Sequence, residues 1–107
     1  MKRGDVVTVV APGDYGKPRP ALVVQSDLFQ DHPSVTVCLM TSDLRDTPLF
    51  RFTVPSKTSN GLQKPSQVML DKIVTLLSTR IGETIGRLDD GEMAEVTRLL
   101  ALWLGLA

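Results

Sequence analysis

Residues 16–26 read GKPRPALVVQS, in which a glycine turn runs into two prolines and then into an apolar run. The prolines fix φ on both sides of Arg19, and both Lys17 and Arg19 precede a proline, so both should be extended. Residues 21–24 are apolar and partly β-branched, which predicts a buried strand. Arg19 is therefore expected at the mouth of that strand, where its guanidinium can hold a phosphate or a carboxylate. An arginine there is also common as a solvated strand end or an ion-pair partner, and these residues alone leave both interpretations open.

The length and composition indicate a single globular domain over residues 1–107. Twelve basic and twelve acidic side chains give a net charge of zero, so a nucleic-acid site would have to be a local patch. The only cysteine, Cys38, excludes an intrachain disulfide, and its apolar surroundings favour a buried inert thiol over a nucleophile. The sequence has no N-terminal apolar run and no stretch of membrane-spanning length, which predicts a cytoplasmic protein without a membrane partner.

Apolar patterning predicts a mainly β domain that ends in one helix. Turn chemistry at residues 12–16 separates the first two strands, and a short helical turn is expected near residues 28–30. Asp89 and Glu92 have the spacing of a helix capping box, apolar residues recur at helical intervals from Met93 to Leu104, and Gly105 stops the helix. We expect a small, largely antiparallel barrel or curled sheet with strands at 6–10, 21–25, 34–40, 49–54, 66–77 and 81–88.

Several exposed polar residues fit either a nucleic-acid site or ordinary loop chemistry. Tyr15 is suited to stacking on a base or to covering its own hairpin. Thr41 and Ser42 end the third expected strand, where hydroxyls satisfy turns or donate to a bound oxyanion. Lys57 and Lys64 lie in a proline-bounded loop and would either border a groove or be solvated.

Two titratable residues are ambiguous in a different way. Asp71 interrupts an apolar strand, so its carboxylate needs either a structural partner or an open site. His32, the only histidine, sits between Asp31 and Pro33 in an expected loop and has no companion ligands, so no metal site is predicted.

Five segments together resemble the MazF/PemK family of toxin endoribonucleases, within the wider group that includes the gyrase poison CcdB. The likeness spans nearly the whole chain. The resemblance rests on the order and spacing of the segments more than on any one of them. The segments are RGDVV at 3–7, RPALVVQS at 19–26, MTS at 40–42, GL at 61–62 with Ser66, and IGRL at 85–88.

The resemblance implies an SH3-like antiparallel β-barrel of the CcdB/PemK type that forms a homodimer. It also implies a nuclease that cuts single-stranded RNA without metal or other cofactor and is held inactive by a cognate antitoxin. In this reaction the 2′-hydroxyl of the RNA attacks the scissile phosphorus and leaves a 2′,3′-cyclic phosphate. Such chemistry needs an acid, a base and positive charge on the phosphoryl oxygens.

The resemblance also suggests roles for individual residues. Arg19 matches the catalytic arginine and would stabilise transition-state charge, Thr41 matches a phosphate-binding hydroxyl, and Asp71 matches an acidic catalytic position. Some members carry an arginine two residues before the acidic position, where this chain has Met69, so the general acid is left to Arg19, to Lys17 or to no residue. The residues expected to bind RNA are Lys17, Ser42, Tyr15 and Lys64.

The end of the chain suggests a second hypothesis. Trp103 lies close to Gly105, as an aromatic residue does in the gyrase-binding end of CcdB, so the alternative is a gyrase poison without nuclease activity. Trp103 also fits the apolar face of the helix, where it would pack in the core or in a dimer interface.

Overall fold

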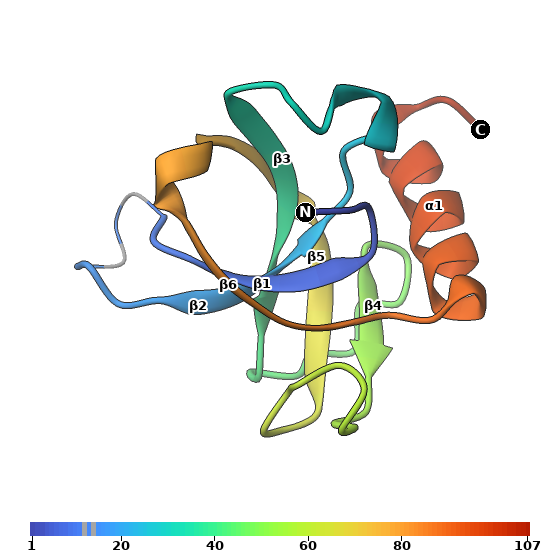
Figure 1. Cartoon of the computed structure of the whole chain (residues 1–107). Coiled ribbons are helices and arrows are strands. Elements are labelled where there is room, and N and C mark those ends of the chain that lie inside the picture. Colours follow the sequence, from blue (N-terminus) through green and yellow to red (C-terminus); the bar gives the residue numbers. More distant parts are fainter. Residues whose placement is uncertain (12, 14) are drawn as a thin grey trace.

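The computed structural model describes residues 1–11, 13 and 15–107 and forms one curled antiparallel sheet with a helix packed beside it (Figure 1). The expected turn at 12–16 includes Pro12 and Asp14, which lie outside the described residues. Within the described chain the strands have the order β4-β5-β3-β2-β1-β6. The elements are β1 (Asp5–Val9), β2 (Arg19–Val23), η1 (Asp27–Phe29), β3 (Ser34–Thr41), β4 (Arg51–Val54), β5 (Ser66–Leu77), η2 (Ser78–Arg80), β6 (Ile81–Arg87) and α1 (Asp90–Leu104).

Strand β2 covers Arg19–Val23, whereas the sequence predicts a strand over 21–25, so both of its ends lie two residues earlier than predicted. Arg19 pairs with Val9 and Pro20 pairs with Thr8, so β1 extends the pairing to the proline. Strand β3 pairs with β2 only as far as Ala21. Proline has no N–H for a ladder hydrogen bond, and the loss costs little where the neighbouring strand has already turned away. The first two residues of β2 therefore have a strand neighbour on one side only.

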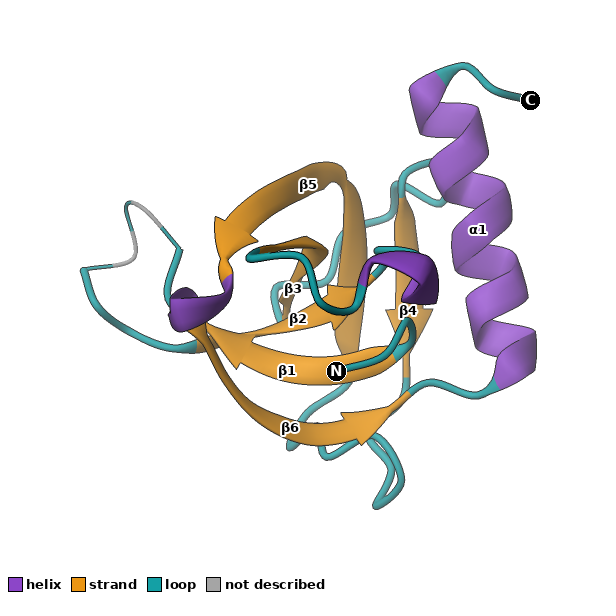
Figure 2. Ribbon diagram, turned by 45° about the horizontal axis from the view of Figure 1, so that its top comes forward, coloured by secondary structure: helices purple, strands orange, loops and turns teal. Residues whose placement is uncertain are grey.

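Strand β5 is long and bent, and it carries the curl of the sheet. Two steps along β3, from Cys38 to Met40, match five steps along β5, from Ile73 to Val68. This bulge gives β5 extra residues and a sharper twist, and its first half then pairs with the short edge strand β4. Figure 2 shows the resulting curved sheet, with α1 along one side.

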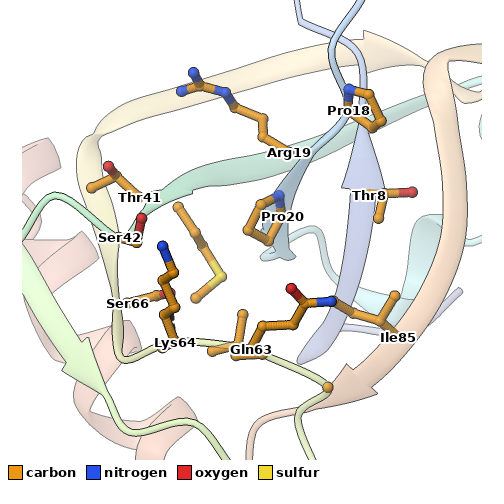
Figure 3. A pocket seen from close by; sticks show the side chains of 13 residues that line it. Thr8, Pro18, Arg19, Pro20, Thr41, Ser42, Gln63, Lys64, Ser66 and Ile85 are labelled. Atoms are coloured by element: carbon orange, nitrogen blue, oxygen red, sulfur yellow. Dashed lines mark hydrogen bonds between the residues drawn. The ribbon is translucent and has the colours of Figure 1, made fainter.

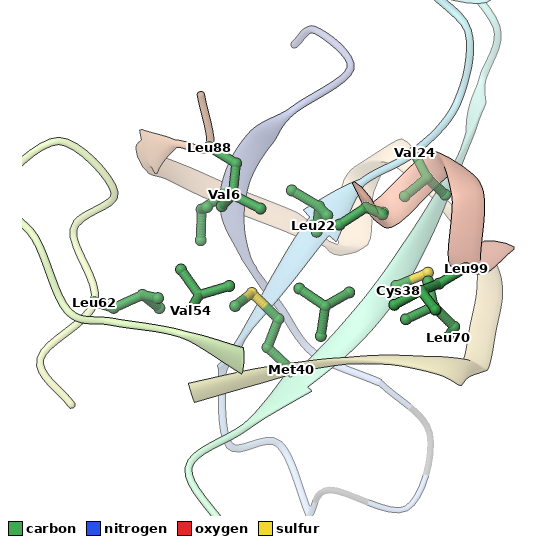
Figure 4. Close-up of a cluster of buried hydrophobic side chains, with 12 residues drawn as sticks. Val6, Leu22, Val24, Cys38, Met40, Val54, Leu62, Leu70, Leu88 and Leu99 are labelled. Carbon is green, nitrogen blue, oxygen red and sulfur yellow. The ribbon is translucent and has the colours of Figure 1, made fainter. Parts of the chain in front are cut away.

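The main hydrophobic core lies between the sheet and α1 (Figure 4). The capping box of Asp89 and Glu92 starts the helix as predicted, and Val96 and Leu99 are its buried residues. Trp103 and Leu104 do not join this core and are about half exposed, which corrects the expectation that they lie on the buried face. The last turn of α1 extends beyond the edge of the sheet (Figure 2). A tilted stack on Phe50, with ring centroids 5.9 Å apart, is the aromatic contact of Trp103.

No described helix has both the length and the apolarity needed to cross a lipid bilayer.

The loop between β4 and β5 is fixed to β6 by close backbone packing. Asn60 is only 1% exposed, and its side chain bonds the N–H groups of Lys57 and Leu62 and the carbonyl of Pro55. A Cβ on Gly86 would lie 2.3 Å from the carbonyl carbon of Asn60, so the two backbones touch at this point. The contact fixes the course of the loop that follows Asn60.

This packing predicts that Gly86→Ala is destabilising. The added methyl group would overlap backbone atoms that Asn60 holds in place, and overpacking of this kind costs about 1–3 kcal/mol of unfolding free energy. Urea unfolding followed by circular dichroism measures it. Gly91→Ala is the matched control, because a Cβ there has its nearest neighbour at 3.5 Å and alanine favours a helix. Equal stability of the two variants would contradict the packing argument.

Cys38 is predicted to be inert to thiol reagents in the folded protein. It is fully buried, and burial raises the pKa of its thiol to about 12. The positive charge of Arg3 opposes this rise in pKa, and Asp71 adds to it. The thiolate is the reactive form, so a disulfide reagent at pH 8 should label the protein only after urea unfolding. Since the folded state keeps this proton when the unfolded chain has lost it, the thiol also makes stability fall as pH rises from about 9 toward 12. Rapid labelling of folded protein would contradict this account.

Candidate functional site

A cavity of about 570 Å³ opens where β2 and β3 separate (Figure 3). Two cations, four hydroxyls and one amide face it together with apolar side chains, and no carboxylate is found among the described residues that line it. The lining consists of Thr8, Pro18, Arg19, Pro20, Met40, Thr41, Ser42, Gly61, Leu62, Gln63, Lys64, Ser66 and Ile85.

Arg19 occupies the rim of this cavity on the first residue of β2. Its backbone pairs with Val9 on one side, and β3 is absent on the other, so the half-buried side chain has room to cross the opening. In Figure 3 its side chain extends from β2 across the view of β5, and Thr41 and Ser42 lie lower in the picture at the end of β3. The expectation of an extended Arg19 at a strand mouth is thus confirmed, with the strand starting at this residue.

Thr41 is the last residue of β3, and its hydroxyl has a defined partner. The backbone N–H of Asp43 donates to Thr41 Oγ1 at 3.1 Å. A hydroxyl has one proton and two acceptor positions, so this bond leaves the proton of Thr41 for another acceptor. Ser42 follows and is exposed at the same end of the cavity.

Lys64 approaches the same end from the loop that precedes β5. In Figure 3 its side chain points from that loop toward Ser42 and Thr41. Lys57, which also belongs to the β4–β5 loop, is instead turned toward α1, where its ammonium lies 3.8 Å from a carboxylate oxygen of Glu92. Of the two loop lysines considered from the sequence, Lys64 is the one at the cavity.

The electrostatic character of the cavity differs from that of the whole chain. The net charge of the protein is zero, yet Arg19 and Lys64 face a space whose described lining has no acidic side chain. A second cavity, of about 320 Å³, shares Thr8 and Pro18 with the first, and the part of its lining that the structure describes adds Arg80 and no carboxylate. The two form a continuous surface that favours an anionic ligand.

Three of the predicted site residues lie outside the lining of this cavity. Lys17 and Tyr15 are exposed on the loop before β2, and Tyr15 is 99% exposed with a φ of 53°. Asp71 sits in the bulged part of β5, where its buried Oδ1 has no hydrogen-bond partner among the described residues. Its charge acts on the thiol of Cys38, which belongs to the core beneath α1 (Figure 4).

The structure also adds residues to the site that the sequence did not single out for it. Thr8, Gln63 and Ser66 bring polar groups to the cavity from β1, the β4–β5 loop and β5. Ser66 carried a signal, because it belongs to the segments that resemble the toxin family, whereas Thr8 and Gln63 had none beyond their polarity. His32 is remote from this site; its Nδ1 accepts from the N–H of Ser34 in an exposed loop. The described residues contain no cluster of histidine, cysteine or acidic side chains suited to a metal.

Comparison with known proteins shows the family of this chain. A family model described as "PemK-like, MazF-like toxin of type II toxin-antitoxin system" matches residues 2–104. The chain is 39% identical over 108 residues to "Probable endoribonuclease MazF" of Mycolicibacterium smegmatis, an alignment that covers 100% of this chain and 99% of that protein.

Solved structures have the same architecture. The "Mycobacterium tuberculosis toxin MazF-mt6" aligns with a TM-score of 0.83 at 23% identity, over 96% of this chain and 98% of that one. An "Endoribonuclease in complex with its cognate antitoxin from Mycobacterial species" aligns with a TM-score of 0.81 at 25% identity, over 100% of this chain and 97% of that one. The predicted mainly β fold with a C-terminal helix is confirmed. Because the family model and the curated relative both span nearly the whole chain, this protein belongs to the PemK-like, MazF-like toxins of type II toxin-antitoxin systems.

Proposed function

We propose that this toxin is a metal-independent endoribonuclease that cleaves single-stranded mRNA by transesterification. The observation that carries the proposal is the placement of Arg19, Thr41 and Lys64 around one cavity whose described lining has no carboxylate. The cations of such a surface attract the negative charge of a phosphodiester, and no carboxylate of the described lining repels it. The relative from Mycolicibacterium smegmatis, whose name describes a probable endoribonuclease, supports the same reaction class.

In the proposed step the 2′-hydroxyl oxygen of the RNA forms a bond to the scissile phosphorus while the bond to the 5′-oxygen breaks. The products are a 2′,3′-cyclic phosphate and a 5′-hydroxyl. The 2′-hydroxyl loses one proton and the leaving oxygen gains one, so the reaction needs no co-reactant. Charge accumulates on the two phosphoryl oxygens, where the fork of Arg19 and the proton of Thr41 supply fixed donors.

Proton transfer is the part of the mechanism with no dedicated side chain in this cavity. Arg19 is proposed to act as a cation that donates hydrogen bonds rather than as an acid. The described lining contains no histidine or carboxylate, and the cavity is open to water. We therefore assign proton exchange to solvent. A catalytic role for Asp71 would have to be indirect, through the position of β5, because it does not line the cavity.

RNA is proposed to run along the continuous surface of the two cavities. Lys64 and Ser42 contact the backbone near the scissile phosphate, and Lys17 and Tyr15 bind from the exposed loop beside β2, where the tyrosine ring is free to stack on a base. Single strands fit because their bases can be splayed out and their backbone follows an irregular groove.

The cognate antitoxin is proposed to compete for the same surface. A structural relative is described in complex with its cognate antitoxin, and a disordered acidic segment would suit a cavity with two cations. We further propose that the protein acts in the cytoplasm as a homodimer, for which the half-exposed Trp103 and Leu104 offer apolar surface.

Arg19→Ala should lower kcat for RNA cleavage by about 10³-fold, because a positioned donor to a developing oxyanion is worth about that factor. The measurement is end mapping and rate determination on a mixed single-stranded RNA in EDTA. Arg98→Ala is the control, since Arg98 pairs with Glu95 on the exposed face of α1.

An unchanged rate for Arg19→Ala would reject the role of Arg19, and loss of wild-type cleavage in EDTA would reject metal independence. Intact RNA combined with gyrase-dependent toxicity would favour the alternative of a gyrase poison.

Lys64→Ala should weaken RNA binding and reduce its dependence on salt. The logarithm of the binding constant falls as the logarithm of the salt concentration rises. Removing one phosphate contact should make this slope less steep by about 0.7 to 1 for a single strand. Binding is measured with an RNA that carries a 2′-deoxy nucleotide at the mapped cleavage site, which prevents the reaction. Lys57→Ala should keep the wild-type slope, because Lys57 pairs with Glu92 away from the cavity. Equal slopes for the two variants would contradict the placement of Lys64.

A further inference from the structure

The side-chain amide of Gln67 is buried at the junction of β3, β4 and β5, and both of its ends are bonded. Gln67 is only 5% exposed and pairs directly with Thr41 across the sheet. Its Oε1 accepts from the N–H of Arg45 at 3.0 Å and from Arg51 Nη1 at 3.0 Å. Its Nε2 donates to the carbonyl of Arg45 at 2.9 Å and to Thr53 Oγ1 at 3.1 Å. An amide satisfied on both sides in this way has one orientation.

Arg51 extends this network into the loop that follows Thr41. The terminal nitrogen Nη1 donates to Gln67 Oε1 and also to the carbonyl oxygen of Asp43, at 2.9 Å. A guanidinium NH₂ has two hydrogens, so one nitrogen serves both acceptors. The guanidinium thus fixes the carbonyl of Asp43 relative to an amide that is itself immobile.

The same residue, Asp43, reaches the cavity through its other backbone group. Its N–H donates to Thr41 Oγ1 at 3.1 Å. The contacts therefore form a continuous path from the buried Gln67 through Arg51 and Asp43 to the hydroxyl that faces the cavity. Occupation of one acceptor position on Thr41 Oγ1 limits the directions in which its own proton can point.

We propose that Arg51, held by Gln67, is a positioning residue that sets the direction of the Thr41 hydroxyl for phosphate binding. The inference rests on the proposed role of Thr41 in RNA cleavage. Arg51 itself does not line the cavity, so its effect on the reaction passes through Asp43 and Thr41. A small displacement of a group that must meet the transition state is enough to slow a reaction by about 10²-fold.

The test is a double-mutant cycle on single-turnover cleavage of an oligonucleotide that carries the mapped cleavage site. The variants are Arg51→Met, which removes both donors, Thr41→Val, which removes the hydroxyl, and the pair combined. We expect Arg51→Met to lower kcat by about 10-fold to 10²-fold with KM little changed, and to add no further loss in the Thr41→Val background. A role limited to loop stability would instead add to the effect of Thr41→Val.

Arg45→Ala is the matched control. Arg45 lies in the same loop, but its guanidinium pairs with the exposed carboxylate of Asp43 and takes no part in the path to Thr41, so kcat should not change. Arg51→Lys keeps the charge and can replace one of the two bonds, so it should recover part of the rate. It also keeps the test valid if thermal unfolding shows that Arg51→Met does not fold.

The outcomes separate the two hypotheses. Multiplicative losses in the double variant, or wild-type kcat in folded Arg51→Met or Arg51→Lys, would overturn the positioning role alone. An unchanged rate for Thr41→Val would reject the role of Thr41 and this inference with it, while RNA cleavage itself would stand. Absence of cleavage by the wild-type protein would overturn the proposed function as well.

Discussion

The departure of β3 from β2 beyond Ala21 is the constraint on which the site depends. It leaves the first two residues of β2 paired with β1 alone, and it opens the space that Arg19 faces. Pro20 suits this position because β3 no longer pairs with β2 there, so a residue without an N–H costs no ladder bond to β3. Had the ladder between β2 and β3 continued by two residues, the strand ends would have closed over the cavity. The catalytic proposal therefore follows from an interruption of regular hydrogen bonding in the middle of a sheet.

The other walls of the cavity are held by contacts that leave their backbones little freedom. The loop before β5 is fixed to β6 where Gly86 meets Asn60, and that loop carries Lys64 to the opening. On the opposite side, Gln67 and Arg51 hold the loop after Thr41. A site that stabilises charge with donors already in position avoids the cost of reorganising them during the reaction. The contact of Gly86 with Asn60 and the bonds of Arg51 to Gln67 and Asp43 would provide that preorganisation for the proposed reaction.

The sequence was informative about the elements and less so about their registers. The β-branched runs predicted the strands along the chain, and the change to helical spacing at Asp89 predicted the terminal helix. The constrained backbone of Arg19 predicted its place at the start of a strand. The start of β2 was missed because it depends on how far β1 pairs with β2, which is a tertiary property. Asp71 was expected at a catalytic position, but it does not line the cavity. It lies in the bulge of β5, which arises from unequal pairing of β3 and β5 and has no signature in a single sequence. The link from Gln67 to Arg51 joins residues that are far apart along the chain, so local patterns could not reveal it.

The lining of the cavity is drawn from the whole length of the chain, from Thr8 on β1 to Ile85 on β6. An N-terminal fragment that ends before β6 lacks one of these walls, since β6 borders β1, the partner of β2. The complete cavity therefore exists only in a chain long enough to include β6 and to pair it with β1.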